Sequence, residues 1–483
     1  MQDKTRSRFG GRPCRLAWAG LILLAAVAGT VGAGPPNIII ILADDLGYGD
    51  LGCFGNPTIR TPRLDRMASE GQKWTSFYAG AIVCTPSRAA LITGRYAIRS
   101  GLVSDKTWVL PHNAAAGLPD EEVTLAAMLQ ARGYATGYLG KWHLGQLPRY
   151  LPTRRGFDYY YGTPYSNDEK VADQWSHEFQ GKRSWEASLF YHPRSEYWDI
   201  PLMRNEEILQ RPVDQTTLTP NYTEEAIRFI RRHRQGPFFL FLSHNMPHVP
   251  LFSSPRFRGK SLAGPYGDAV EELDWSTGRI LDVLREEGLA GNTLVVFTSD
   301  NGPWAAFREH GGSSGLLRDQ KGTTWEGGIR VPAIFWWPGR VGTGIVTGIG
   351  SAMDLFNTAI SLAGGEVPGD RIIDGVDLTP ALLGNGKSPR ETLLYYRGRR
   401  VWAVRKGPFK AHFFTKGEWG HDLVEERHDP PLLFHLDRDP SERFDIAADH
   451  PEVIAEIREI LRRHEADLVA GEDLLVKRLP PEH

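Results

Sequence analysis

The sequence predicts an α/β fold with a large, mostly parallel (mixed) sheet flanked by helices, followed by a smaller C-terminal α+β domain with an antiparallel sheet. Several short runs are continuously apolar, which is typical of strands that are buried on both faces of a parallel sheet. Segments with helical spacing of apolar residues alternate with these runs over most of the chain. After about Gly375 the pattern changes to closely spaced short strands, which indicates a second domain.

The first buried strand is predicted at 37–42, where Asn37 precedes four isoleucines and a leucine. β-Branched side chains of this kind favour extended backbone. Later strands of the same sheet are predicted at 134–139, 238–242, 294–297 and 331–337, with amphipathic helices before 134–139 and before 294–297. The segment 160–219 has weak periodicity and many aromatic and charged residues, so long loops and short elements that cover a site are expected there. In the C-terminal part, strands are predicted at 393–396, 401–404 and 410–414, and a helix at 451–468.

The N-terminal segment is interpreted as a secretory signal. Basic residues precede an apolar run at 16–31, and Val31-Gly32-Ala33 resembles a signal-peptidase site. The alternative is an uncleaved anchor, but the run is short for a spanning helix and rich in Ala and Gly. We therefore predict a signal peptide at 1–33, the main α/β domain at 34–375 and the C-terminal subdomain at 376–483. Export would leave the protein periplasmic, extracellular or lysosomal.

The overall charge argues against two classes of partner. Lys and Arg number 56 against 58 Asp and Glu, a net charge of −2. Neither nucleic acid nor an anionic membrane is expected as a partner of so balanced a chain. No segment after the N-terminal run is long and apolar enough for a stable membrane span.

Polar clusters follow four of the predicted strands, and we expect them to gather at one edge of the sheet, where ligands of open α/β sheets bind. They are Asp44-Asp45, Lys141 with His143, His244 with His248, and Asp300-Asn301. The two acidic clusters supply three carboxylates and an amide, the oxygen ligands that a hard divalent cation prefers. Taken singly, each cluster could equally be a turn, a helix cap or a solvated loop.

Cys84-Thr85-Pro86-Ser87-Arg88 is the most specific motif in the chain. A lone Cys is more often a small buried hydrophobe than a nucleophile. However, Cys-x-Pro-x-Arg resembles the signature of the type I sulfatases. Further matching segments stand in the order of that family, at 43–50, 140–145, 247–250, 298–302 and 321–328. The mature chain thus resembles this family along nearly its whole length, and within it the branch of arylsulfatase A and N-acetylgalactosamine-6-sulfatase.

The resemblance implies an alkaline-phosphatase-like fold and an arylsulfatase-like enzyme that cleaves sulfate esters of an aryl alcohol, a sugar or a lipid. It implies that Cys84 is oxidised to formylglycine (3-oxoalanine), and that Ca²⁺ is held by Asp44, Asp45, residue 84, Asp300 and Asn301. The implied catalytic residues are Cys84, Arg88, Lys141, His143, His248 and Lys321, with Lys141, Ser166, His248 and Lys321 binding the sulfate.

The mechanism that the resemblance implies is nucleophilic catalysis. One hydroxyl of the hydrated aldehyde attacks sulfur, with Asp300 as base and His248 or Lys321 as acid for the leaving alcohol. His143 then deprotonates the second hydroxyl, which expels sulfate. Arg88 supports the hydrated aldehyde, whereas His244 matches no assigned position and is interpreted as structural or supporting.

Two alternatives stay open: a phosphoester hydrolase of the same fold, and a catalytically inactive relative that binds sulfated glycans. The expected partners are a sulfated small molecule or glycan and a formylglycine-generating maturation enzyme. The oligomeric state is open, with a dimer among the choices.

Overall fold

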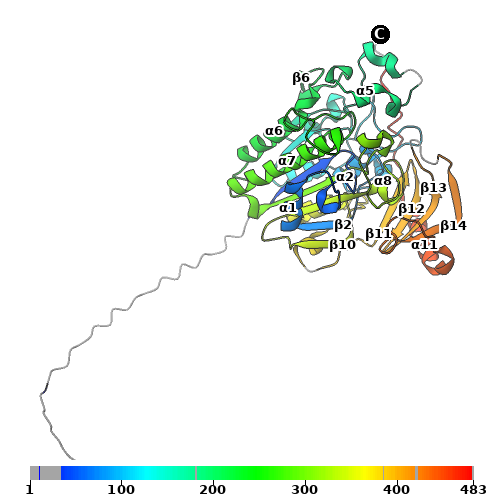
Figure 1. Ribbon diagram of the computed structural model, residues 1–483. Helices are drawn as coiled ribbons and strands as arrows, with labels where there is room; N and C mark the ends of the chain where they lie inside the picture. Colours follow the sequence, from blue (N-terminus) through cyan, green and yellow to red (C-terminus); the bar gives the residue numbers. More distant parts are fainter. Residues whose placement is uncertain (1–9, 11–33, 180–181, 385, 419–422, 481–483) are drawn as a thin grey trace, which may run out of the picture. The chain divides into compact units, whose positions relative to one another are not determined.

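Ten strands form the central sheet of the computed structural model (Figure 1), which describes residues 10, 34–179, 182–384, 386–418 and 423–480. The strand order is β10-β2-β9-β8-β1-β7-β3-β4-β5-β6. Their bounds along the chain are β1 Asn37–Ala43, β2 Gln72–Tyr78, β3 Ala135–Gly140, β4 Tyr159–Gly162, β5 Leu202–Arg204, β6 Glu207–Gln210, β7 Phe238–Ser243, β8 Thr293–Ser299, β9 Arg330–Trp336 and β10 Gly344–Ser351. Apart from Gly10, the predicted signal peptide at 1–33 lies outside the described residues.

The centre of this sheet is parallel. β1 pairs in parallel with β7 and β8, and β3 pairs in parallel with β7 and β4. β9 runs antiparallel to both β8 and β2, and β5 runs antiparallel to β4 and β6. The sheet is therefore mixed with a parallel core, which confirms the predicted fold class.

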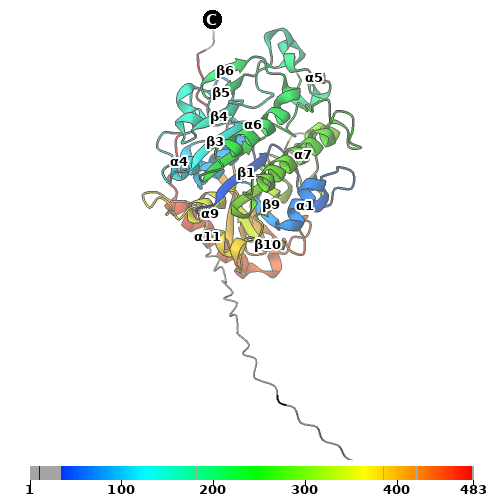
Figure 2. The ribbon, with the colours of Figure 1, turned by 90° about the vertical axis from the view of Figure 1, so that its left-hand side faces the viewer.

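Helices cover both faces of the sheet because the central strands are apolar on both sides. In β1, Ile38, Ile40 and Leu42 belong to one apolar cluster, whereas Ile39 and Ile41 belong to the other. The first face carries α2 Cys84–Thr93, α4 Leu125–Gln130 and α9 Asp354–Leu362. The second carries α1 Pro62–Glu70, α6 Leu218–Arg232 and α7 Gly264–Glu286, which lie across the sheet in Figure 2. The remaining short helices are α3 Ala97–Ser100, α5 Ser188–Tyr191, α8 Glu326–Ile329 and α10 Thr379–Leu383.

A second sheet follows in the C-terminal part. Its antiparallel strands are β11 Thr392–Arg397, β12 Arg400–Lys406, β13 Phe409–Thr415 and β14 Glu426–His435, with α11 Pro451–Asp467 packed against them (Figure 1). β11 to β13 and α11 were predicted from the sequence. β14 was not, because Pro430 and Pro431 stand within it; proline is tolerated here because β14 is an edge strand.

The predicted boundary at 375/376 stays a prediction, since residues 35–483 form one compact unit. The tail also returns to the first part of the chain, where Leu479 N donates to Asn113 O and Gly471 N to Ile98 O. Within the part of the chain that the structure describes, no helix is both long and apolar enough to cross a membrane.

Candidate active site

The four predicted polar clusters follow four neighbouring strands. Asp44 and Asp45 come directly after β1, and Asp300 comes directly after β8. Lys141 follows β3, and His244 follows β7. These strands stand in the order β8-β1-β7-β3 and are parallel, so their carboxyl ends present the clusters side by side.

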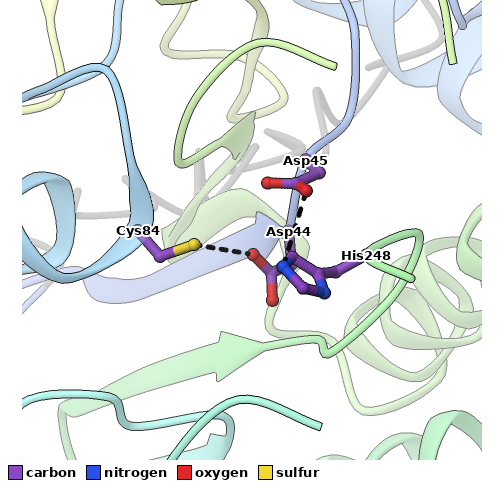
Figure 3. Close-up of side chains that lie close together, drawn as sticks. All are labelled: Asp44, Asp45, Cys84 and His248. Carbon is purple, nitrogen blue, oxygen red and sulfur yellow. Dashed lines mark hydrogen bonds and ion pairs between the residues drawn. The ribbon is translucent and has the colours of Figure 1, made fainter. Parts of the chain in front are cut away.

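Four buried side chains converge at this edge (Figure 3). Asp44, Asp45, Cys84 and His248 each offer one ligand atom within 4.8 Å of the others. Cys84 Sγ lies 3.7 Å from Asp44 Oδ1, and His248 Nε2 lies 3.6 Å from Asp45 Oδ2. Segments more than 150 residues apart in the sequence thus meet at one point.

Asp300 and Asn301 complete the acidic group. Asp300 Oδ1 accepts a hydrogen bond from the backbone N of Asp45 at 3.2 Å, and Asn301 Nδ2 donates to Asp45 Oδ1 at 2.7 Å. Asn301 Oδ1 is buried, and no described residue bonds to it. The three carboxylates and this amide oxygen together form a set of oxygen donors, and the amide oxygen accepts no hydrogen bond from the described residues. These residues fit a hard divalent cation.

Two lysines neutralise part of this acidic group. Lys141 Nζ lies 2.5 Å from Asp44 Oδ2 and donates to Ser166 Oγ at 3.0 Å. Lys321 Nζ lies 2.7 Å from Asp45 Oδ1. Both lysine side chains are buried, which is rare for Lys without a paired charge. The two ammonium groups could equally face an anionic ligand.

Arg88 provides the third cation, one turn after Cys84 on α2. Its Nη2 lies 2.8 Å from Asp300 Oδ2 and 3.4 Å from Asp44 Oδ1. Its Nη1 donates to Ser243 Oγ and to the carbonyl of Lys141. A guanidinium held at so many points is rigid, so it fixes the two carboxylates in place.

The pKa values of these acids follow from burial and from one another. Burial opposes ionisation of Asp44, but the charges of Lys141, His248 and Arg88 outweigh it and lower the pKa. Burial and the charge of Asp44 raise the pKa of Asp300 to about 7. Burial likewise raises the pKa of Asp45, although Lys321 opposes the change. The repulsion that remains between these carboxylates is what a bound cation would relieve.

Cys84 begins α2 and is buried, with Val83 as the N-cap. Burial raises the pKa of its thiol, and the nearby Lys141 and Lys321 only partly oppose the rise. The side chain therefore stays a neutral thiol at neutral pH. Because the thiolate is the nucleophilic form, unmodified Cys84 is a poor nucleophile in this position.

The histidines differ in their surroundings. Burial, together with the charges of Lys321 and Lys141, lowers the pKa of His248, whose Nδ1 lies 2.5 Å from the carbonyl of Val249. His244 lies outside the cluster, with Nε2 at 3.4 Å from Ser276 Oγ, and burial lowers its pKa to about 3. The interpretation of His244 as structural or supporting stays a prediction.

Three further residues at the site were not singled out from the sequence. Glu169 lies 2.6 Å from His143 Nε2. The Trp304 ring lies under Lys321, with Nζ 4.4 Å from the ring centroid. Ser243, the last residue of β7, accepts from Arg88. Ser243 could have been found from its place at a strand end, whereas the loop residues Glu169 and Trp304 follow matched motifs by a few positions and carry no pattern of their own.

The comparisons with known proteins agree over nearly the whole chain. The sulfatase family model matches residues 36–365, and the model of the C-terminal region of aryl-sulfatase matches residues 388–481. Arylsulfatase A of Bos taurus is 42% identical over 92% of this chain and 90% of its own length. N-acetylgalactosamine-6-sulfatase of Sus scrofa is 41% identical over 94% of this chain and 91% of its own.

A solved structure supports the same assignment. The PsFucS1 sulfatase from Pseudoalteromonas sp. superimposes with a TM-score of 0.79 at 30% identity, covering 90% of this chain and 92% of the other. Family models, full-length relatives and the shared fold thus point the same way, and the chain belongs to the sulfatase family, the sulfuric ester hydrolases.

Proposed function

We propose that this chain releases inorganic sulfate from a small aryl sulfate, a sulfated sugar or a sulfolipid after Cys84 has been converted to formylglycine. The observation that carries the proposal is the position of Cys84, buried against Asp44 and in the field of Lys141 and Lys321. A hydrated aldehyde supplies two hydroxyls on one carbon, so one can accept the sulfuryl group and the other can release it. A buried neutral thiol has neither capacity.

We propose Ca²⁺ as the metal, held by Asp44, Asp45, Asp300, Asn301 and residue 84. The support is the all-oxygen character of the other four side chains and the unused oxygen of Asn301. A bound divalent cation would polarise an oxygen of the substrate or of residue 84. Lys141 and Lys321 pair with these same carboxylates, so their ammonium groups stand beside the metal position.

The remaining residues bind the sulfate and move protons. Lys141, Lys321, His248 and Ser166 would contact sulfate oxygens; fixed positive charge aimed at a developing anion stabilises the transition state. Asp300 would act as base towards residue 84, His248 or Lys321 as acid towards the leaving alcohol, and His143 as the second base. Arg88 would fix the positions of residue 84 and Asp300 through its ion pairs with Asp300 and Asp44.

Two features of the wider biology belong to the same proposal. A formylglycine-generating enzyme must act on the chain, and residues 1–33 would serve as a signal peptide for export. Residues 376–483 would form the C-terminal α+β subdomain. The oligomeric state, with a dimer among the choices, would be measured by sedimentation of the purified protein.

The test combines mass analysis with sulfate release. Peptide mass spectrometry of the protein made with and without the maturation enzyme reports the aldehyde at residue 84. We expect hydrolysis of an aryl sulfate and of sulfated monosaccharides to rise in proportion to conversion, and to be lost in Cys84→Ala. Cys53→Ala is the matched control, because Cys53 lies outside the cluster. Hydrolysis that is independent of conversion, or faster with phosphate esters, would refute the proposal.

A further inference from the structure

His143 is held through one ring nitrogen. Its imidazole is buried just beyond the end of β3, two residues after Lys141. Nε2 lies 2.6 Å from Glu169 Oε1 and 3.0 Å from the carbonyl oxygen of Leu110. Nδ1 is buried too, and it has no hydrogen-bond partner among the residues that the structure describes.

These contacts determine the tautomer of the neutral ring. A carbonyl oxygen can only accept a hydrogen bond, so Nε2 must carry the hydrogen that reaches Leu110. The neutral imidazole then has its lone pair at Nδ1. The only unused polar atom of His143 is therefore a proton acceptor.

Glu169 stands on a short segment that serves two site residues. Ser166, which accepts from Lys141, also accepts the backbone N–H of Glu169 at 3.4 Å through its carbonyl. The backbone of His143 is tied to the nucleophile's helix, since Thr85 Oγ1 donates to its carbonyl at 3.1 Å. Glu169 therefore contacts a histidine whose backbone is fixed to Thr85, the residue that follows Cys84.

The charges around His143 make Glu169 the one partner that favours a charged ring. Burial lowers the pKa of His143, and the charges of Lys141 and Arg88 lower it further, whereas Glu169 raises it. The Glu169 side chain is 11% exposed, so little water screens the contact between the carboxylate and the ring. If His143 becomes an imidazolium, the carboxylate of Glu169 stabilises its charge.

We propose that Glu169 is a positioning residue for His143: together with the carbonyl of Leu110 it holds the tautomer that has Nδ1 as the base, and it pairs with the imidazolium once Nδ1 has taken up a proton from a hydroxyl in the site. This inference rests on the proposed function of His143 as the second base. The logic is that of a carboxylate that orients a catalytic histidine.

The structural part is tested without turnover, by NMR of ¹⁵N-histidine-labelled protein, with the His143 signals assigned by their loss in His143→Gln. We expect the wild-type ring to show a protonated Nε2, a bare Nδ1 and a slowly exchanging Hε2. In Glu169→Ala the carbonyl of Leu110 remains as an acceptor but the shorter contact is lost, so we expect that proton to exchange faster and its signal to shift. A wild-type ring protonated at Nδ1, or a signal unchanged in Glu169→Ala, would overturn the inference.

The kinetic part uses Glu169→Ala and the milder Glu169→Gln, which keeps an acceptor oxygen but removes the charge. We expect kcat on an aryl sulfate to fall about 10²-fold in Glu169→Ala, with KM changing less than about twofold. Glu169→Gln should lie between it and the wild type. Asp173→Asn is the matched control, because it removes one exposed negative charge four residues away.

Equal kcat losses in Glu169→Ala and Asp173→Asn would overturn a specific role for Glu169, as would a rise in KM without a fall in kcat. If Glu169→Ala does not fold, the tautomer of the wild-type ring and the kcat of Glu169→Gln decide the question. A wild-type protein that cleaves no sulfate ester would refute the proposed function, and the NMR result would still decide whether Glu169 fixes the His143 ring.

Discussion

Lys141 Nζ and Asp44 Oδ2 lie 2.5 Å apart, and both side chains are wholly buried. The two residues follow β3 and β1, which are separated in the sheet by β7. The pair therefore links the ends of two strands across the middle of the site. A buried ion pair is costly to form but still more costly to break by removing one partner.

Replacing Lys141 should weaken both folding and catalysis. In Lys141→Met, Asp44 keeps only the more distant Arg88 among its cations in direct contact, at 3.4 Å. We expect the free energy of unfolding in a chelator to fall by about 3–5 kcal/mol, the cost of leaving a buried charge unpaired. Urea unfolding measures this, and sulfate release should fall in the same variant because the proposed contact of Lys141 with the sulfate would be lost.

The control for this variant is Lys170→Met. Lys170 pairs with Asp199 at 3.0 Å, but both side chains are about a quarter exposed, at 26% and 28%. A pair so exposed contributes less than about 1 kcal/mol. Equal losses of unfolding free energy in the two variants would contradict a large contribution of the buried Lys141–Asp44 pair to stability.

Metal removal should lower stability as well as activity. A ligand that binds only the folded state at 100 times its Kd adds about 2.7 kcal/mol. We therefore expect Ca²⁺ to raise the Tm of chelator-treated protein, and Asn301→Ala to reduce the rise. Asn292→Ala is the control, since its amide contacts Pro35 O far from the acidic group. A Tm that does not respond to Ca²⁺, Mg²⁺ or Mn²⁺ would contradict the metal site.

The sequence predicts the centre of the molecule well because its signals are local. β1, β3, β7, β8 and β9 are apolar runs that need burial on two faces, so each can be recognised alone. Parallel strands end at one edge, so the residues after them could be grouped before any contact was known. The acidic cluster and Lys141 follow from this rule, whereas Lys321 comes from a glycine-rich loop and the family resemblance.

What the sequence leaves open depends on tertiary packing. β9 looks like the other buried runs, but its antiparallel direction comes from its partners β8 and β2. β4, β5 and β6 are short strands in the segment expected to hold long loops and short elements, and their addition to the central sheet was not predicted. Glu169 and Trp304 contact neighbours more than 15 residues away in the sequence, so no spacing rule could identify them.

Gly140 should be essential to the placement of Lys141. Its φ is +102°, and a Cβ added there would lie 1.7 Å from the carbonyl oxygen of Ser243. Gly140→Ala must therefore move β3 away from β7, and we expect a large fall in Tm together with loss of activity. In Gly133→Ala the φ of +81° is also unfavourable, but nothing lies within 4 Å of the new Cβ. We expect only about 1–2 kcal/mol there, and comparable losses in both would contradict the steric argument.

Glu326 and Lys410 should govern acid stability. Lys410 on β13 lies 2.9 Å from Glu326 Oε1 and donates to Thr324 O at 2.7 Å, next to the loop that carries Lys321. Burial opposes ionisation of Glu326, but Lys410, Arg330 and Arg405 outweigh it and lower its pKa from 4.5 to about 2. Because the folded pKa is the lower one, the stabilisation is present above about pH 4.5 and is lost as the pH falls through about 2.

In Lys410→Met this protection should shrink. The pKa of Glu326 in the folded state should rise towards its ordinary value, so acid unfolding should begin at a higher pH, and the free energy of unfolding at pH 7 should fall by about 3–5 kcal/mol. Lys406→Met is the control, because Lys406 pairs with Glu456 at the surface and such pairs contribute less than about 1 kcal/mol. Circular dichroism between pH 7 and pH 2 follows the transition. If the acid transition does not shift in Lys410→Met, Arg330 and Arg405 alone hold Glu326 ionised. The C-terminal sheet would then not stabilise the loop of Lys321 through Lys410.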